Sequence, residues 1–106
     1  MNEPTYFTLA ALLDGPLHGY GIVKRASELS GGRLRIAAGT LYGVLDRLRE
    51  QGLVADEGQE IVGGRARRSY RLTAAGEGAL AEEAERMRAA ARVVHSRRPT
   101  AEASPA

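Results

Sequence analysis

The chain has no cysteine and no tryptophan among its 106 residues, and aromatic residues make up only 5% of it. Without cysteine, neither disulfide bonds nor thiolate metal sites can form. The two histidines, His18 and His95, lie far apart with no cysteine to complement them, so we expect no metal site and no cofactor. Without tryptophan, a pocket that holds a flat aromatic compound between indole rings is excluded.

Long hydrophobic runs are also missing. The apolar stretch near the start, within MNEPTYFTLAALLDG, is far shorter than the roughly 20 apolar residues of a membrane span. It is also too short, and too lightly charged at its beginning, for a signal peptide. We therefore expect no membrane association and a cytoplasmic location.

Neither sign of charge is in large excess, because 15 lysines and arginines face 13 acidic residues and the net charge is +2. Overall charge therefore does not predict a nucleic-acid partner. Its distribution is more informative: residues 65–71 hold four arginines and no acid, whereas residues 82–92 have mixed signs. With 43% hydrophobic and 26% charged residues, the composition is typical of one soluble globular domain.

The clearest periodic segment is AGTLYGVLDRLREQ, residues 38–51. Its large apolar residues recur at i, i+3, i+4 and i+7, which predicts an amphipathic helix buried on one side: Leu41, Val44, Leu45 and Leu48. Gly52 follows, where a helix ends easily. The remaining surface offers an aromatic ring, a hydroxyl group and two arginines, which together suit a groove of DNA.

Two shorter helices are predicted before this segment. The first begins near Pro4 and ends at residues 14–16, and it is apolar on most sides, so the rest of the domain or a second chain must cover it. The second begins within residues 17–21 and ends at residues 30–32. Its expected buried residues are Tyr20, Ile22, Val23, Ala26 and Leu29. Residues 33–37 then join it to the amphipathic helix, as in a helix-turn-helix.

After Gly52 the pattern changes to short β-leaning pieces. Residues 53–55 and 61–62 flank an acidic segment, 56–60, that we expect to form a turn. Two glycines precede residues 68–72, which alternate with Tyr70 and Leu72 on one face. The pattern predicts a β-hairpin with a flexible basic tip, and a hairpin directly behind a helix-turn-helix is a wing.

Thr73 is expected to cap a final helix that runs from about Ala74 to about Val94, roughly 30 Å long. Apolar residues on it alternate steps of four and three, which indicates a short coiled-coil-like seam: Leu80, Ala84, Met87, Ala91 and Val94. Pairs of Glu82 with Arg86 and of Glu85 with Arg88 are expected on its outer face. From about Ser96 onward the tail is expected to be disordered.

Three motifs in order carry a family resemblance: LHGYGI (17–22), GTLYGVLDRLREQGLV (39–54) and GGRARRSYRLTAAGEGAL (63–80). Over roughly Thr5 to Met87 the chain resembles the PadR-family transcriptional regulators, in the short form with a single C-terminal helix. The resemblance implies an α+β, mostly helical fold: a winged helix-turn-helix with a long C-terminal dimerisation helix. We expect a DNA-binding domain at residues 1–73, the dimerisation helix at 74–95 in the same compact unit, and a tail at 96–106.

The resemblance also implies a sequence-specific regulator, usually a repressor, whose homodimer binds a double-stranded operator. The two half-sites should be inverted and about 34–36 Å apart, one turn of DNA. The expected DNA-binding residues are Thr40, Tyr42, Gly43, Arg47, Arg49, Arg65, Arg67 and Arg68.

Each of these side chains also has a structural interpretation. Tyr42 could instead pack on the second helix, and Thr40 could only cap the third helix. Arg47 and Arg49 could be solvated and paired with Asp46 or Glu50, and the wing arginines could belong to a solvated loop. His18 is expected to be a cap or a packing residue.

The subunit contact is expected to involve the first and last helices, through Phe7, Leu80, Ala84, Met87, Ala91 and Val94. Family members often respond to phenolic or other aromatic compounds bound between subunits. A small aromatic effector would here contact Tyr6, Phe7, Met87 and Val93. The other interpretation is that these residues only pack the dimer.

Two other functions fit the sequence less well than a DNA-binding regulator. A winged-helix module that binds protein instead of an operator would have a recognition helix without basic groups, yet Arg47 and Arg49 are present. An enzyme is disfavoured, because no nucleophile has a base nearby and no glycine-rich phosphate loop follows a strand.

Overall fold

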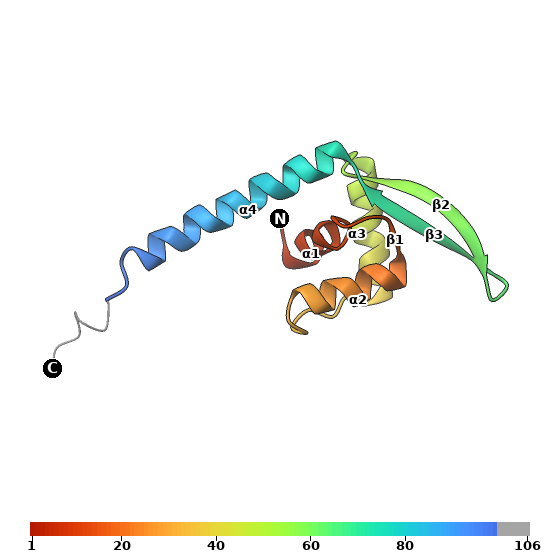
Figure 1. Cartoon of the computed structure of the whole chain (residues 1–106), viewed down its shortest axis with the longest axis horizontal. Coiled ribbons are helices and arrows are strands. Elements are labelled where there is room, and N and C mark those ends of the chain that lie inside the picture. The colour runs from red at the N-terminus through yellow and green to blue at the C-terminus, as the bar shows by residue number, and fades with distance from the viewer. Residues whose placement is uncertain (100–106) are drawn as a thin grey trace.

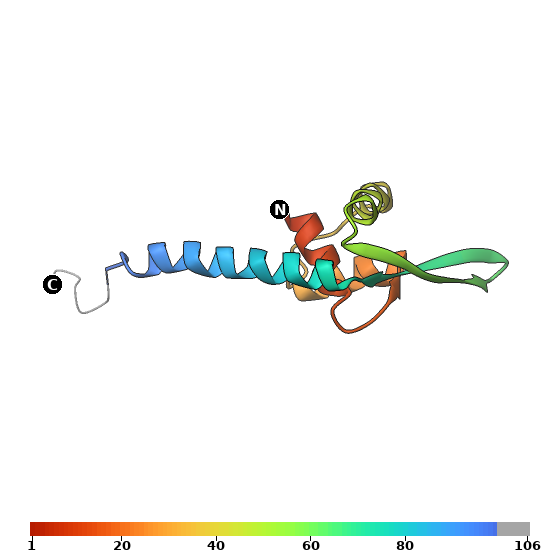
Figure 2. The same ribbon diagram turned by 90° about the horizontal axis from the view of Figure 1, so that it is seen from above.

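The computed structural model describes residues 1–99 as four helices and a three-stranded sheet (Figure 1). In chain order the elements are α1 (Glu3–Ala11), β1 (Leu17–His18), α2 (Gly19–Leu29), α3 (Ala38–Glu50), β2 (Val54–Val62), β3 (Arg65–Leu72) and α4 (Ala74–His95). Helices α1 to α3 form the body, the β2–β3 hairpin extends to one side, and α4 projects to the other (Figures 1 and 2). The fold is the predicted winged helix-turn-helix. Of the predicted tail, residues 100–106 lie outside the described part.

The core lies among the three helices of the body and the base of the sheet. The apolar face predicted for α3 is confirmed, since its four large residues are all buried. In α2 the prediction was wrong for Tyr20 and Leu29, which are 73% and 46% exposed. The buried positions of α2 are Gly19, Ile22 and Ala26, so Tyr20, about 200° around the helix from Ile22, faces solvent.

Strand β1 was not predicted from the sequence. Residues 17–18 were expected to open the second helix, but Leu17 pairs with Tyr70 and His18 with Ser69, antiparallel to β3. The strand order is therefore β1-β3-β2. Two residues show no alternation, and their partner strand lies about fifty residues away, so a local pattern could not reveal this strand.

The hairpin is confirmed, but its turn was misplaced. The acidic segment 56–60 belongs to β2, with a register shift between Asp56 and Gly58. The chain turns at Gly63 and Gly64, whose φ values of 57° and 77° suit a two-residue hairpin turn. The wing arginines consequently lie in strand β3 and not in a loop.

Helix α4 begins as predicted, with the Thr73 hydroxyl oxygen accepting the Gly76 N–H at 3.0 Å. Only its first half packs on the body, and the remainder projects, giving the molecule extents of 67 × 26 × 22 Å (Figure 1). Arg86 pairs with Glu83 at 3.0 Å instead of Glu82. Within residues 1–99 no ion pair forms between Glu85 and Arg88. None of the helices in this part of the chain is long and apolar enough to cross a membrane.

Candidate nucleic-acid interface

Helix α3 presents a polar face whose backbone is bare at two positions. Thr40 is exposed, and it is not the cap: the helix begins after Ala37, which makes no side-chain capping bond. Gly39 and Gly43 have no heavy atom within 4 Å of the place where a Cβ would stand. A glycine inside a helix costs about 1 kcal/mol relative to alanine. On this face, the absence of two side chains leaves room for another molecule to approach the helix backbone closely.

Tyr42 both packs and remains accessible. A Cβ on Gly19 would stand 2.8 Å from the Tyr42 hydroxyl oxygen, so the phenol lies over the first residue of α2. The side chain is nevertheless 49% exposed. Packing on α2, one of the two interpretations of Tyr42, is therefore present, and about half of the residue still remains exposed to solvent.

The two arginines of α3 have different surroundings. Arg49 donates to Asp46 Oδ1 at 3.0 Å and to Asp56 Oδ1 at 3.2 Å, so it ties α3 to β2. The interpretation that pairs Arg49 with Asp46 agrees with this geometry, and Arg49 becomes a support of the wing. Arg47 is exposed and lines a hollow beside Met1 and Thr5 at the start of α1. In the described residues Arg47 has no ion-pair partner.

The wing arginines Arg65, Arg67 and Arg68 are exposed and lie beside a hollow at the start of α2, here called the wing hollow. Its lining consists of His18, Gly19, Tyr20, Tyr42, Val62 and residues 65–68, and includes no carboxylate. The absence of acid among several cations suits an anion.

His18 is the helix cap that was predicted, because its Nδ1 accepts the Gly21 N–H at 3.1 Å. Its other ring nitrogen, Nε2, lies 3.3 Å from Arg67 Nη1, and its ring stacks on Tyr20 with centroids 6.4 Å apart. His18 and Tyr20 were not predicted as parts of this surface. Only the unpredicted pairing of β1 with β3 brings them to the arginines.

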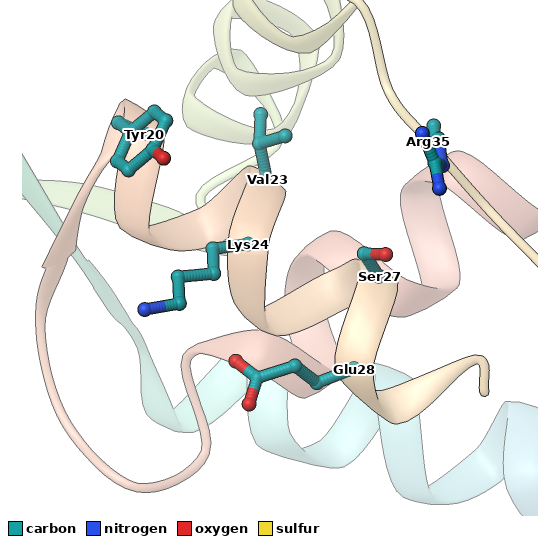
Figure 3. Close-up of a pocket in the computed structure, with 6 residues that line it drawn as sticks. All are labelled: Tyr20, Val23, Lys24, Ser27, Glu28 and Arg35. Carbon is teal, nitrogen blue, oxygen red and sulfur yellow. The ribbon is translucent and has the colours of Figure 1, made fainter. Parts of the chain in front are cut away.

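A second hollow, on the outer side of α2, adds two more cations near α3. It is lined by Arg35, from the segment leading into α3, and by five residues of α2 (Figure 3): Tyr20, Val23, Lys24, Ser27 and Glu28. Lys24 and Glu28 extend to the same side of the helix (Figure 3). A carboxylate is thus present here, unlike in the wing hollow.

The predicted interface residues are split between two helices. On α1, the rings of Tyr6 and Phe7 meet edge to face at 5.3 Å. On α4, Leu80 is buried against its own chain, whereas Met87 and Val94 are 43% and 60% exposed. Ala84, Ala91 and Val93 are exposed as well. Most of the seam is thus left uncovered by the described residues, 1–99.

A helix-turn-helix followed by a basic hairpin defines the winged helix-turn-helix class of DNA-binding proteins. Within that class, the profile of the transcriptional regulator PadR-like family matches residues 8–82. The chain belongs to this family, and it is a PadR-family transcriptional regulator.

Individual relatives agree with this assignment. The transcriptional regulator Rv3488 of Mycobacterium tuberculosis is 43% identical over 81 residues, which cover 76% of this chain and 72% of the relative. The crystal structure of a PadR-family regulator from Eggerthella lenta superposes with a TM-score of 0.72 at 32% identity, covering 87% of this chain and 78% of that one. Bacillus subtilis PadR in complex with operator DNA gives a TM-score of 0.64 at 26% identity, over 74% of this chain and 44% of that one.

Proposed function

We propose that this regulator is a repressor whose homodimer binds an inverted-repeat operator with helix α3 in the major groove. The observation that carries the proposal is the polar face of α3, bare at Gly39 and Gly43 and flanked by the exposed arginines of β3. A structural neighbour, Bacillus subtilis PadR, is described in complex with operator DNA, which supports the same use of this fold.

Direct readout is assigned to the exposed edge of α3. Thr40 and Arg47 lie on this edge, about two turns apart, and an arginine can donate two hydrogen bonds to guanine. In this proposal Arg65, Arg67 and Arg68 bind phosphates of the flanking backbone, and these contacts set the position of the protein without reading sequence. Tyr42 supplies a hydroxyl between these two groups.

Dimerisation is assigned to α1 and the projecting part of α4. One α3 carries few side chains that can read bases, so useful specificity requires two copies on a two-fold axis. The exposed seam residues Met87, Ala91 and Val94 supply an apolar stripe for the contact. Half-sites about 34–36 Å apart follow from two α3 helices in successive major grooves.

Effector control is assigned to the same interface. Tyr6 and Phe7 already form an edge-to-face aromatic pair, and Met87 and Val93 are exposed on α4. In a dimer that joins these helices, the four side chains would offer an apolar site for a small aromatic compound. Its test is release of bound DNA by simple phenolic acids, compared with their non-aromatic analogues.

The central experiment measures binding of the purified protein to DNA from its own promoter and to a scrambled duplex, by fluorescence anisotropy at near-physiological salt. Preference for the promoter by a factor of about a thousand, saturating at two chains per site, is the expected result. Equal, strongly salt-sensitive binding to both duplexes would contradict sequence specificity. No binding would favour a winged-helix module that binds protein.

Two substitutions separate base readout from phosphate binding. Arg47→Ala is expected to weaken promoter binding about tenfold or more and to relax the preference at one or two base pairs. Arg67→Ala should weaken all duplexes alike and reduce the salt slope by about one. Equal effects of both substitutions on every duplex would remove Arg47 from base readout.

A further inference from the structure

The tautomer of the His18 imidazole follows from its role as a helix cap. Its Nδ1 accepts the Gly21 N–H at 3.1 Å, so this nitrogen carries a lone pair. In a neutral imidazole the proton then resides on Nε2, which makes Nε2 a donor.

The neighbour of Nε2 is also a donor. Arg67 Nη1 lies 3.3 Å away, and a guanidinium group has no acceptor. The two groups therefore cannot hydrogen-bond to each other in this tautomer, and each presents an N–H beside the other with no acceptor between them. An oxygen that accepts from both would satisfy the pair.

The surroundings favour an anion as that acceptor. The lining of the wing hollow adds Arg65, Arg68 and the phenol of Tyr42, but no carboxylate. The N-terminus of the eleven-residue helix α2, with its partial positive charge, lies at the same place. Glu60 is the cross-strand partner of Arg67, yet among the described residues no ion pair joins them, and the guanidinium lies against His18 instead.

We propose that His18 Nε2–H and Arg67 together bind one backbone phosphate of the DNA duplex in the wing hollow. The inference rests on the proposed function, because α3 and the wing must face the duplex for this phosphate to enter. A phosphodiester oxygen carries negative charge and no proton, so it accepts from both groups. His18 thereby links two roles: one ring nitrogen caps α2, and the other binds the DNA backbone.

Two substitutions of His18 separate these roles. His18→Asn retains a good capping acceptor but lacks a donor at the Nε2 position. His18→Gln places an amide N–H near that position but is a poor cap. We expect His18→Asn to weaken binding to any duplex about tenfold with an unchanged melting temperature. His18→Gln should lower the melting temperature by several degrees and retain most of the affinity.

Salt dependence distinguishes the two partners. His18 is neutral in this arrangement and releases no counterion, so His18→Asn should leave the salt slope unchanged, whereas Arg67→Ala should reduce it by about one. Because both groups contact one phosphate, the double variant should lose less affinity than the product of the two single losses. Wild-type affinity of His18→Asn, or losses that multiply independently, would overturn the proposal.

The source of the phosphate is tested separately. The imidazole NMR signals of His18 should shift on addition of a short duplex but not with millimolar inorganic phosphate at constant ionic strength. Saturation by inorganic phosphate alone would overturn the assignment to the DNA backbone. Scrambled duplex can replace promoter DNA in this titration. A lack of promoter preference would therefore contradict the proposed operator binding, whereas the shift of the His18 signals would still test the phosphate contact.

Discussion

At the scale of single residues, two glycines of α4 show how strongly surroundings decide what a position tolerates. A Cβ on Gly76 would stand 2.1 Å from the carbonyl oxygen of Leu53 and 2.7 Å from Leu72 Cδ1, whereas nothing lies within 4 Å of one on Gly78. In the sequence, Gly76 is only a glycine in the first turn of a helix that Thr73 caps. A glycine is required at this position because the backbone of Leu53, just before β2, packs against it, and no local sequence pattern predicts that contact.

The same replacement at these two positions should have opposite effects. Gly78→Ala should raise the free energy of unfolding by about 0.5–1 kcal/mol, because alanine loses less backbone entropy in a helix. Gly76→Ala should lower it by about 3 kcal/mol, since the backbone of Leu53 must move. Urea unfolding followed by circular dichroism measures both, and stabilisation by Gly76→Ala would contradict the packing of α4 on this segment.

Tyr70 gives the fold a dependence on alkaline pH. Burial raises the pKa of its phenol above the ordinary 10, although the cation of Arg68 acts in the opposite direction. Below pH 10 the phenol is neutral in both states. Above it the unfolded chain loses this proton first, so the free energy of unfolding should fall as pH rises.

Urea unfolding between pH 8 and pH 11 tests this expectation. Tyr70→Phe should make the decline shallower. Tyr20→Phe, at an exposed ring, is the matched control and should leave it as in the wild type. An identical decline in all three proteins would show that Tyr70 is not its source.

At the scale of elements, α3 has one well-packed apolar face and one polar face on which glycine lowers the stability of the helix. Gly43→Ala should stabilise the protein by about 0.5–1 kcal/mol, the same effect expected of Gly78→Ala, because both sites have open space for the methyl group. If the DNA backbone or a base edge approaches Gly43 closely, the same substitution should weaken promoter binding about tenfold. Gly78→Ala, remote from α3, supplies the control, and unchanged affinity of Gly43→Ala would argue against close approach.

Elements with strong periodicity could be predicted from the sequence, and elements fixed by distant partners could not. The apolar spacing of α3 and the capping by Thr73 depend on neighbours within one or two turns, and both predictions were confirmed. Strand β1 exists only because β3 pairs with it. The acidic segment 56–60 resembled a turn in composition, but pairing with residues 67–70 makes it a strand.

At the scale of the whole molecule, the prominent feature is the part of α4 that leaves the body (Figure 2). The candidate interface could be predicted in outline, because its basic and apolar residues are grouped in the sequence. The ion pairs of Arg49 and the approach of His18 to Arg67 could not, because they depend on how α2, α3 and the wing meet.

A pair of alanines tests whether the seam joins two subunits. Ala91 lies on the seam, whereas Ala89 is about two and a half turns from Leu80 and so lies on the opposite face; both are exposed. Ala91→Glu should weaken self-association more than tenfold, because a carboxylate would enter an apolar contact. Ala89→Glu should leave it unchanged. Sedimentation velocity over a range of concentrations measures both, and equal behaviour would move the contact away from this seam.

The order of the sheet has a consequence for how copies of this protein meet. Because β3 lies in the middle, the nine-residue strand β2 has one unpaired edge. Such an edge can add a strand from another molecule and start aggregation. Here it carries Asp56, Glu57 and Glu60 and is interrupted by the register shift before Gly58. Asp56 and Glu57 are paired with Arg49 and Arg71 of their own chain, and an added strand would have to desolvate these charged groups and fit the irregular register. Association between strands is therefore discouraged, which agrees with the proposal that two chains join through their helices.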